Sequence, residues 1–272
     1  MRLAGEQAGA GPAVVLLHGL TATRRYVLMG SRLLGRSGLR VVAYDARGHG
    51  ASAPAPEPRG YGYELLAGDL LAVLDELAVE RPILVGASMG AHTALRFALA
   101  HPERVGALCL ITPSFDPALP RGPEAFSAWD ALARGLREDG VEGFVRAYDL
   151  AAVPPEWRQT TETVLRQRLA AHEHPHAVAD ALEVVPRSRP FESVDALAQV
   201  AVPAVVVASR DEADPGHPLE VGERYARAIP AARLVVEESG SPIAWRGGAL
   251  SRIILELAQD AAARARSSGA HT

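Results

Sequence analysis

The chain has 272 residues, 48% of them hydrophobic and 22% charged, which is typical of a soluble globular protein. Its single cysteine, Cys109, excludes a disulfide framework and cysteine-held metal centres. A net charge of −4 without a long basic run argues against nucleic-acid binding, and no stretch of about 18 apolar residues suggests a membrane span. The first residues lack the apolar run of a signal peptide. We therefore expect a cytoplasmic monomer or homodimer that acts on a small molecule, without nucleic-acid or membrane partners.

Short apolar runs alternate with helix-length segments along the chain. In order, the predicted strands are Val14–Leu17, Arg40–Tyr44, Pro82–Val85, Ala107–Ile111, Ala204–Ala208 and Arg233–Val236. Strands that are apolar on both faces are typical of a parallel sheet covered by helices on both sides. The alternation predicts an α/β protein with a mostly parallel, twisted sheet.

One region interrupts this alternation. Between residues 115 and 189 no strand-like run occurs, and the apolar periodicity indicates helices instead, over residues 123–138, 141–150, 155–172 and 175–185. We interpret residues 115–189 as a helical cap, inserted into a core formed by residues 1–114 and 190–272.

The segment Gly86-Ala87-Ser88-Met89-Gly90 fits the G-x-S-x-G pattern. It follows a predicted strand and opens a predicted helix, which is the context of a nucleophile elbow. Such a turn exposes the serine hydroxyl at the end of the sheet, beside a helix N-terminus that favours developing negative charge. Ser88 is therefore the candidate nucleophile.

Three further motifs accompany the elbow: His18-Gly19 after the first predicted strand, the turn Asp45–Ser52, and the strand 202–210 that leads to Asp211. Together the four motifs resemble those of the α/β-hydrolase fold family. The resemblance covers about residues 2–265 and points to capped enzymes for small molecules, such as enol-lactonases, haloperoxidase-like esterases and C–C bond hydrolases. It implies that the amides of Leu20 and Met89 form an oxyanion hole and that Asp211 is the acid of a catalytic triad.

The resemblance fails at the triad base, because Ser241 occupies the position after the last strand where the family carries histidine. A serine hydroxyl cannot act as a general base near neutral pH. His217 is the candidate replacement, since it lies only six residues beyond Asp211 in a loop expected at the carboxyl edge of the sheet. Asp214, in the same loop, is expected either to pair with His217 or to bind a polar substrate group.

We expect the substrate pocket to include His18, Gly19, Asp214, Ser241 and Trp245. The cap histidines His172, His174 and His176 could supply another base, but Pro175 interrupts the helical spacing that a metal site would need. We expect no metal and no cofactor, since the glycine-rich turns match no nucleotide-binding motif.

The first functional hypothesis is therefore a serine-type hydrolase of a small ester, lactone or C–C bond substrate, with a non-standard triad. Two alternatives remain open: a lyase, cyclase or isomerase that uses the oxyanion pocket without an acyl-enzyme, and a catalytically weak pseudoenzyme that binds a small molecule. Fold alone does not decide between them.

Overall fold

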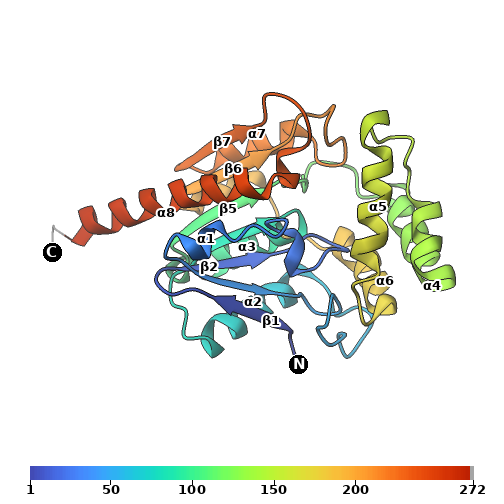
Figure 1. Cartoon of the computed structure of the whole chain (residues 1–272), viewed down its shortest axis with the longest axis horizontal. Helices are drawn as coiled ribbons and strands as arrows, with labels where there is room; N and C mark the ends of the chain where they lie inside the picture. The colour runs from blue at the N-terminus through green and yellow to red at the C-terminus, as the bar shows by residue number, and fades with distance from the viewer. Residues whose placement is uncertain (270–272) are drawn as a thin grey trace.

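The computed structural model describes residues 1–269, so the last three residues of the predicted core lie outside it. A sheet in the order β1-β3-β2-β4-β5-β6-β7 forms the centre of the described chain (Figure 1). Only β1 is antiparallel to its neighbour β3, and the other pairs are parallel. This confirms the predicted mostly parallel sheet. The strands are β1 (Gly5–Ala8), β2 (Ala13–Leu17), β3 (Arg40–Tyr44), β4 (Ile83–Ala87), β5 (Ala107–Ile111), β6 (Ala204–Ala208) and β7 (Ala232–Val236).

Helices cover both faces of the sheet, as predicted from its apolar strands. Side chains of α2, α3 and α7 pack in one apolar cluster with the strands, and those of α1 and α8 pack in a second cluster on the opposite face. The bounds are α1 (Leu33–Arg36), α2 (Tyr63–Glu76), α3 (Met89–Ala100), α7 (Leu219–Ala228) and α8 (Gly247–Gly269).

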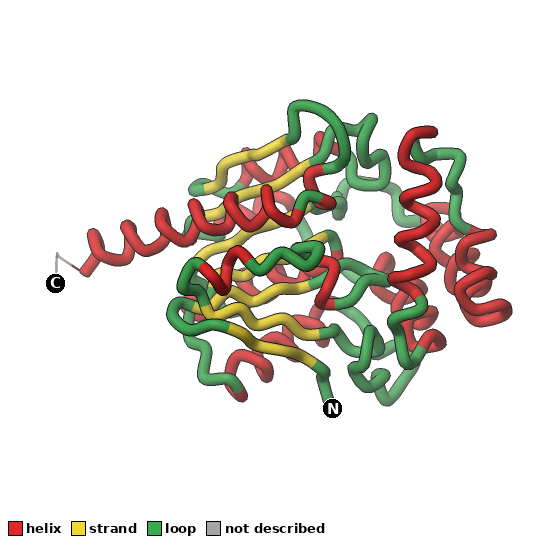
Figure 2. The backbone as a smooth tube through the Cα atoms, in the orientation of Figure 1, coloured by secondary structure: helices red, strands yellow, loops and turns green. Residues whose placement is uncertain are grey.

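Three further helices lie together to one side of the sheet, between β5 and β6 in the chain (Figure 2). They are α4 (Ser127–Ala147), which is interrupted at Asp139 and Gly140, α5 (Arg158–Leu169) and α6 (Pro175–Val184). They share an apolar cluster of their own, against which Leu20 packs from the end of β2. This cluster supports the division into a core and a cap over residues 115–189, which stays a proposal.

Short 3₁₀ helices complete the described chain: η1 (Arg24–Tyr26), η2 (Pro102–Arg104), η3 (Pro123–Phe126), η4 (Pro155–Trp157), η5 (Val185–Arg187), η6 (Val194–Gln199) and η7 (Ile243–Trp245). Within residues 1–269, none of the helices combines the length and the apolar character that crossing a bilayer requires.

Candidate active site

Ser88 occupies a strained turn between β4 and α3. Its φ of 49° and ψ of −111° lie where an L-residue is rarely found, and such strain is typical of functional sites. The turn closes only because the residues two positions before and after Ser88 are glycines. A Cβ atom on Gly86 would lie 2.2 Å from the carbonyl oxygen of Gly90, and one on Gly90 would lie 2.1 Å from the carbonyl oxygen of Leu17. The G-x-S-x-G sequence therefore has a steric cause.

The loop between β6 and α7 brings a histidine to Ser88. The Nε2 atom of His217 lies 3.1 Å from the Oγ atom of Ser88. On the other side of the ring, Nδ1 lies 3.0 Å and 3.1 Å from the two carboxylate oxygens of Asp214. Because a carboxylate can only accept, Nδ1–H donates to Asp214 and leaves the Nε2 lone pair facing the serine hydroxyl. Ser88, His217 and Asp214 thus form a continuous hydrogen-bond chain.

The structure corrects the expectation for Asp211. Its Oδ1 atom accepts a hydrogen bond of 2.8 Å from the amide of Leu219, the first residue of α7. Asp211 therefore stabilises a helix N-terminus, while Asp214 contacts the histidine. Sequence reasoning favoured Asp211 because it follows the strand directly. The spacing of Asp214 and His217, three residues apart in a turn, is the signal that could have indicated which carboxylate contacts the histidine.

The position expected for the family histidine is used differently. The hydroxyl of Ser241 accepts from Nε of Arg246 at 3.3 Å, and the same guanidinium donates to the carbonyl oxygens of Ser239 and Ser241. The ring of Trp245 meets Trp157 of η4 edge to face, with centroids 5.9 Å apart. The contacts of Arg246 stabilise the loop that contains Ser241, and the two tryptophans pack residues 155–157 against residues 243–245. Ser241 forms no hydrogen bond to Ser88 among the described residues.

The expected oxyanion residues flank the serine. A Cβ atom on Gly19 would lie only 3.5 Å from the Cβ atom of Ser88, so the turn after β2 closely approaches the elbow. Met89 begins α3 and precedes the first residue whose amide has an intrahelical acceptor. Among residues 1–269, neither the Leu20 amide nor the Met89 amide donates a hydrogen bond. Both amides are therefore left without an acceptor in the part of the chain that the structure describes.

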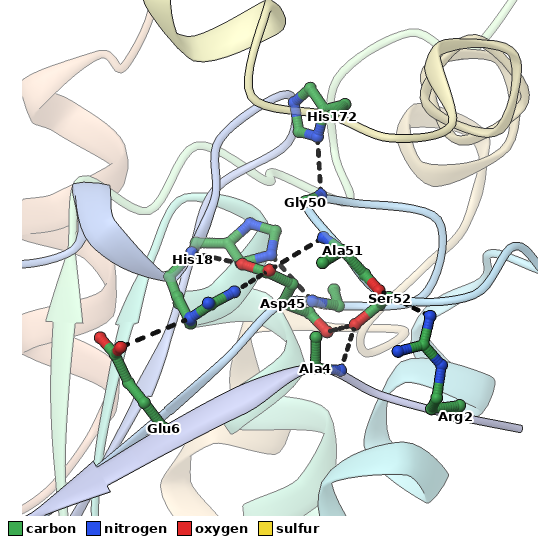
Figure 3. A network of polar contacts seen from close by, with 11 residues as sticks. Arg2, Ala4, Glu6, His18, Asp45, Gly50, Ala51, Ser52 and His172 are labelled. Atoms are coloured by element: carbon green, nitrogen blue, oxygen red, sulfur yellow. Dashed lines mark hydrogen bonds and ion pairs between the residues drawn. The ribbon is translucent and has the colours of Figure 1, made fainter.

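His18, which was expected in the substrate pocket, holds this turn and uses both of its ring nitrogens within the protein. Its Nδ1–H donates to the carbonyl oxygen of Gly19 at 2.8 Å, while Nε2 accepts from the amide of Ala46 at 2.9 Å. Burial lowers the pKa of His18 to about 4, so the ring stays neutral and keeps both bonds. The neighbouring Asp45 contacts Arg24 and the amide of Ala51 in the same network (Figure 3).

Two other histidines near the site also have structural partners. His172, from the loop between α5 and α6, accepts from the amide of Gly50 at 2.8 Å and lies 2.9 Å from the carbonyl oxygen of Thr21, tying cap to core (Figure 3). His92 accepts from the amides of Ser114 and Phe115, and burial lowers its pKa to about 3. Neither is placed as His217 is to take a proton from Ser88.

No metal centre is apparent in the part of the chain that the structure describes, where no group of three His, Cys, Asp or Glu side chains could hold an ion. This includes the cap histidines considered above.

Comparison with known proteins agrees with the architecture. A family model described as alpha/beta hydrolase fold matches residues 12–244. Among curated proteins, the chain is 32% identical over 230 residues to 2-hydroxy-6-oxononadienedioate/2-hydroxy-6-oxononatrienedioate hydrolase 2 of Pseudomonas putida, covering 82% of this chain and 78% of the relative.

Solved structures show the same likeness. A thermophilic esterase from Thermogutta terrifontis superposes with a TM-score of 0.78 at 25% identity, over 95% of this chain and 93% of the esterase. The enol-lactonase of Burkholderia xenovorans LB400 gives a TM-score of 0.75 at 24% identity, over 94% and 96% of the two chains, and this likeness shows the fold alone.

Proposed function

This chain belongs to the α/β-hydrolase fold family, and from that premise we propose that it is a serine hydrolase with the triad Ser88–His217–Asp214. Its substrate is a small ester or lactone. The observation that carries the proposal is the hydrogen-bond chain from the strained serine through the imidazole to a carboxylate. It argues against the pseudoenzyme hypothesis, because a base is in hydrogen-bond contact with the nucleophile although the family position for histidine holds Ser241.

Acylation begins when the Ser88 oxygen attacks the substrate carbonyl carbon and its proton passes to Nε2 of His217. Asp214 accepts from Nδ1–H throughout, which keeps the correct tautomer and stabilises the imidazolium. The amides of Leu20 and Met89 donate to the oxyanion of the tetrahedral intermediate. When the intermediate collapses, the imidazolium protonates the leaving alkoxide, and an acyl-Ser88 ester remains.

Deacylation repeats these steps with water. His217 takes a proton from the water as its oxygen attacks the acyl carbon, and then returns a proton to Ser88 as the carboxylic acid leaves. All proton transfers thus use one imidazole, and the proposed mechanism involves no cofactor.

The proposal is tested with 4-nitrophenyl acetate, Ser88→Ala and His217→Gln. We expect the wild-type chain to hydrolyse the ester with a burst of nitrophenolate. Both variants should lose turnover, with His217→Gln reduced about 10²–10⁴-fold, the usual contribution of a positioned base. His176→Gln, at an exposed cap position, is the matched control and should retain wild-type turnover. Full activity in His217→Gln would overturn the assignment.

A further inference from the structure

The loop that carries His217 leads directly into α7. Only Pro218 separates the histidine from the first residue of the helix, whose amide donates to Asp211 at 2.8 Å. The proline ring fixes one of the two backbone dihedral angles of this link. The position of His217 relative to Ser88 therefore depends on where α7 lies.

The apolar side of α7 packs closely on the sheet. Val221 and Tyr225 belong to the same apolar cluster as the strands, and a Cβ atom on Gly222 would lie 2.8 Å from the Cβ atom of Ala208 in β6. Apolar contacts are non-directional, whereas hydrogen bonds require defined distances and angles. We therefore expect polar contacts to set how far α7 lies along its own axis.

The second turn of α7 makes two such polar contacts, both with one short segment after β5. The Tyr225 hydroxyl donates to the carbonyl oxygen of Phe115 at 2.6 Å. The guanidinium of Arg224 pairs with the carboxylate of Asp116, which is only 8% exposed. The ring of Phe191 contacts the rings of both Phe115 and Tyr225, with centroids 5.2 Å and 5.7 Å away. Residues 115 and 116 thus hold α7 from its buried side.

The same segment is also held by the helix that begins after Ser88. His92 lies one turn into α3, and its amide donates to the carbonyl oxygen of Ser88 at 3.1 Å. The Nε2 atom of His92 accepts from the amides of Ser114 and Phe115, both at 3.1 Å. The amide of Ser88 itself donates to Ile111, the last residue of β5, at 2.9 Å. The segment after β5 is therefore anchored to the nucleophile elbow at two points.

A second connection thus joins the nucleophile and the base, besides their own hydrogen bond. It runs from Ser88 along α3 to His92, across residues 114–116 to Arg224 and Tyr225, and back along α7 to His217. The helical parts are only one or two turns long and are held by backbone hydrogen bonds, so they transmit position with little play. This connection matters because the position after β7 that the family uses for histidine holds Ser241 here.

We propose that Tyr225 and the Arg224–Asp116 pair are positioning residues of the triad, which hold α7 where the imidazole of His217 reaches Ser88. This inference rests on the proposed function, since it takes His217 as the base. The three side chains act through His217 and transfer no proton themselves. A displacement of about 1 Å at a reacting group can lower a rate by about 100-fold, so a small shift of α7 should be measurable in the rate.

The first test is a double-mutant cycle that measures how fast a fluorophosphonate labels Ser88. Tyr225→Phe keeps the ring and removes only the hydroxyl that donates to Phe115. It should slow labelling about 10-fold in the wild-type background. In the His217→Gln background the same change should slow labelling less than about twofold, because the base that it positions is already missing.

Arg227→Gln is the matched control, since Arg227 lies on the same helix, is exposed and pairs with Glu223 of that helix. This variant should label at the wild-type rate. A general distortion of the active site by Tyr225→Phe would slow labelling equally in both backgrounds. That result, or an unchanged rate in Tyr225→Phe, would overturn the inference and leave the triad in place. If His217→Gln labels at the wild-type rate, the proposed function fails and the inference fails with it.

The second test changes Arg224, whose side chain is one-third exposed and can be replaced without opening a cavity in the core. Arg224→Met should lower kcat for 4-nitrophenyl acetate about 3- to 10-fold. KM should change little, because His217 acts in acylation and deacylation and both steps slow together. Arg224→Lys retains the charge and should recover at least half of the wild-type kcat. Measurements well below the Tm of each variant separate this effect from lost stability. Wild-type kcat in Arg224→Met, a loss seen only in KM, or equal losses in the two variants would overturn the inference.

Discussion

At the scale of single residues, the two aspartates of the loop after β6 make different contacts. Asp214 contacts the imidazole of His217, and Asp211 contacts a helix amide. The motif and its context predict the strained turn that holds Ser88, and the loop position points to His217, whose ring contacts Ser88. The choice between the aspartates depends on how residues 211–217 fold back, and the only local indication of it is the spacing of Asp214 and His217, three residues apart.

This difference gives a paired prediction for Asp214→Asn and Asp211→Asn. Asp214→Asn should lower kcat for 4-nitrophenyl acetate by up to about 10⁴-fold, because the imidazole loses the partner that fixes its tautomer. Asp211→Asn should leave kcat within about threefold and lower the free energy of unfolding by only about 0.3–1 kcal/mol, since the asparagine oxygen can still accept from Leu219 while the negative charge at the N-terminus of α7 is lost. Steady-state kinetics and urea denaturation measure the two effects. The reverse pattern would make Asp211 the acid.

At the scale of elements, the sequence predicts most strands because they are buried on both faces and so read as apolar runs. β3, β5 and β6 have the predicted bounds, β2 and β7 begin one residue earlier, and β4 begins one residue later and ends two residues later. β1 was missed because its residues Gly5–Ala8 are exposed at the sheet edge and carry no apolar pattern. The expected helices 123–138 and 141–150 are the two parts of α4, separated at Asp139 and Gly140.

The elbow yields a prediction at this scale. Gly90→Ala places a Cβ atom against the Leu17 carbonyl oxygen, a contact that only a backbone shift can relieve. We expect the free energy of unfolding to fall by about 3 kcal/mol or more. Gly68→Ala is the control, because a Cβ atom there meets nothing within 4 Å and should stabilise the exposed side of α2 by about 0.5–1 kcal/mol. Equal stability of the two variants in urea denaturation would contradict the steric account.

At the scale of the whole molecule, four buried histidines stay neutral, and one of them, His172, joins the cap to the core. Burial lowers the pKa of His18 to about 4 and of His92 to about 3, and it also lowers the pKa values of His49 and His172. In the unfolded chain these rings titrate near pH 6.5. As the pH falls below about 6.5, the unfolded state therefore binds protons that the folded state does not bind, and the free energy of unfolding decreases.

We expect the free energy of unfolding to decrease by several kcal/mol between pH 7.5 and pH 5, since His18 and His92 each contribute about 2 kcal/mol over this interval. The urea midpoint, measured at constant ionic strength, should shift to lower urea accordingly. His92→Gln should reduce the slope of stability against pH. A midpoint that is independent of pH in this range would show that the buried rings are protonated in the folded state.

The most direct test of the central claim is the rate at which a fluorophosphonate labels Ser88. The reagent reacts with an activated serine and needs no knowledge of the substrate. We predict one adduct per chain, mapped to Ser88, with a labelling rate reduced about 100-fold or more in His217→Gln and unchanged in His176→Gln. Labelling of His217→Gln at the wild-type rate, or no labelling of the wild-type chain, would contradict a triad of Ser88, His217 and Asp214.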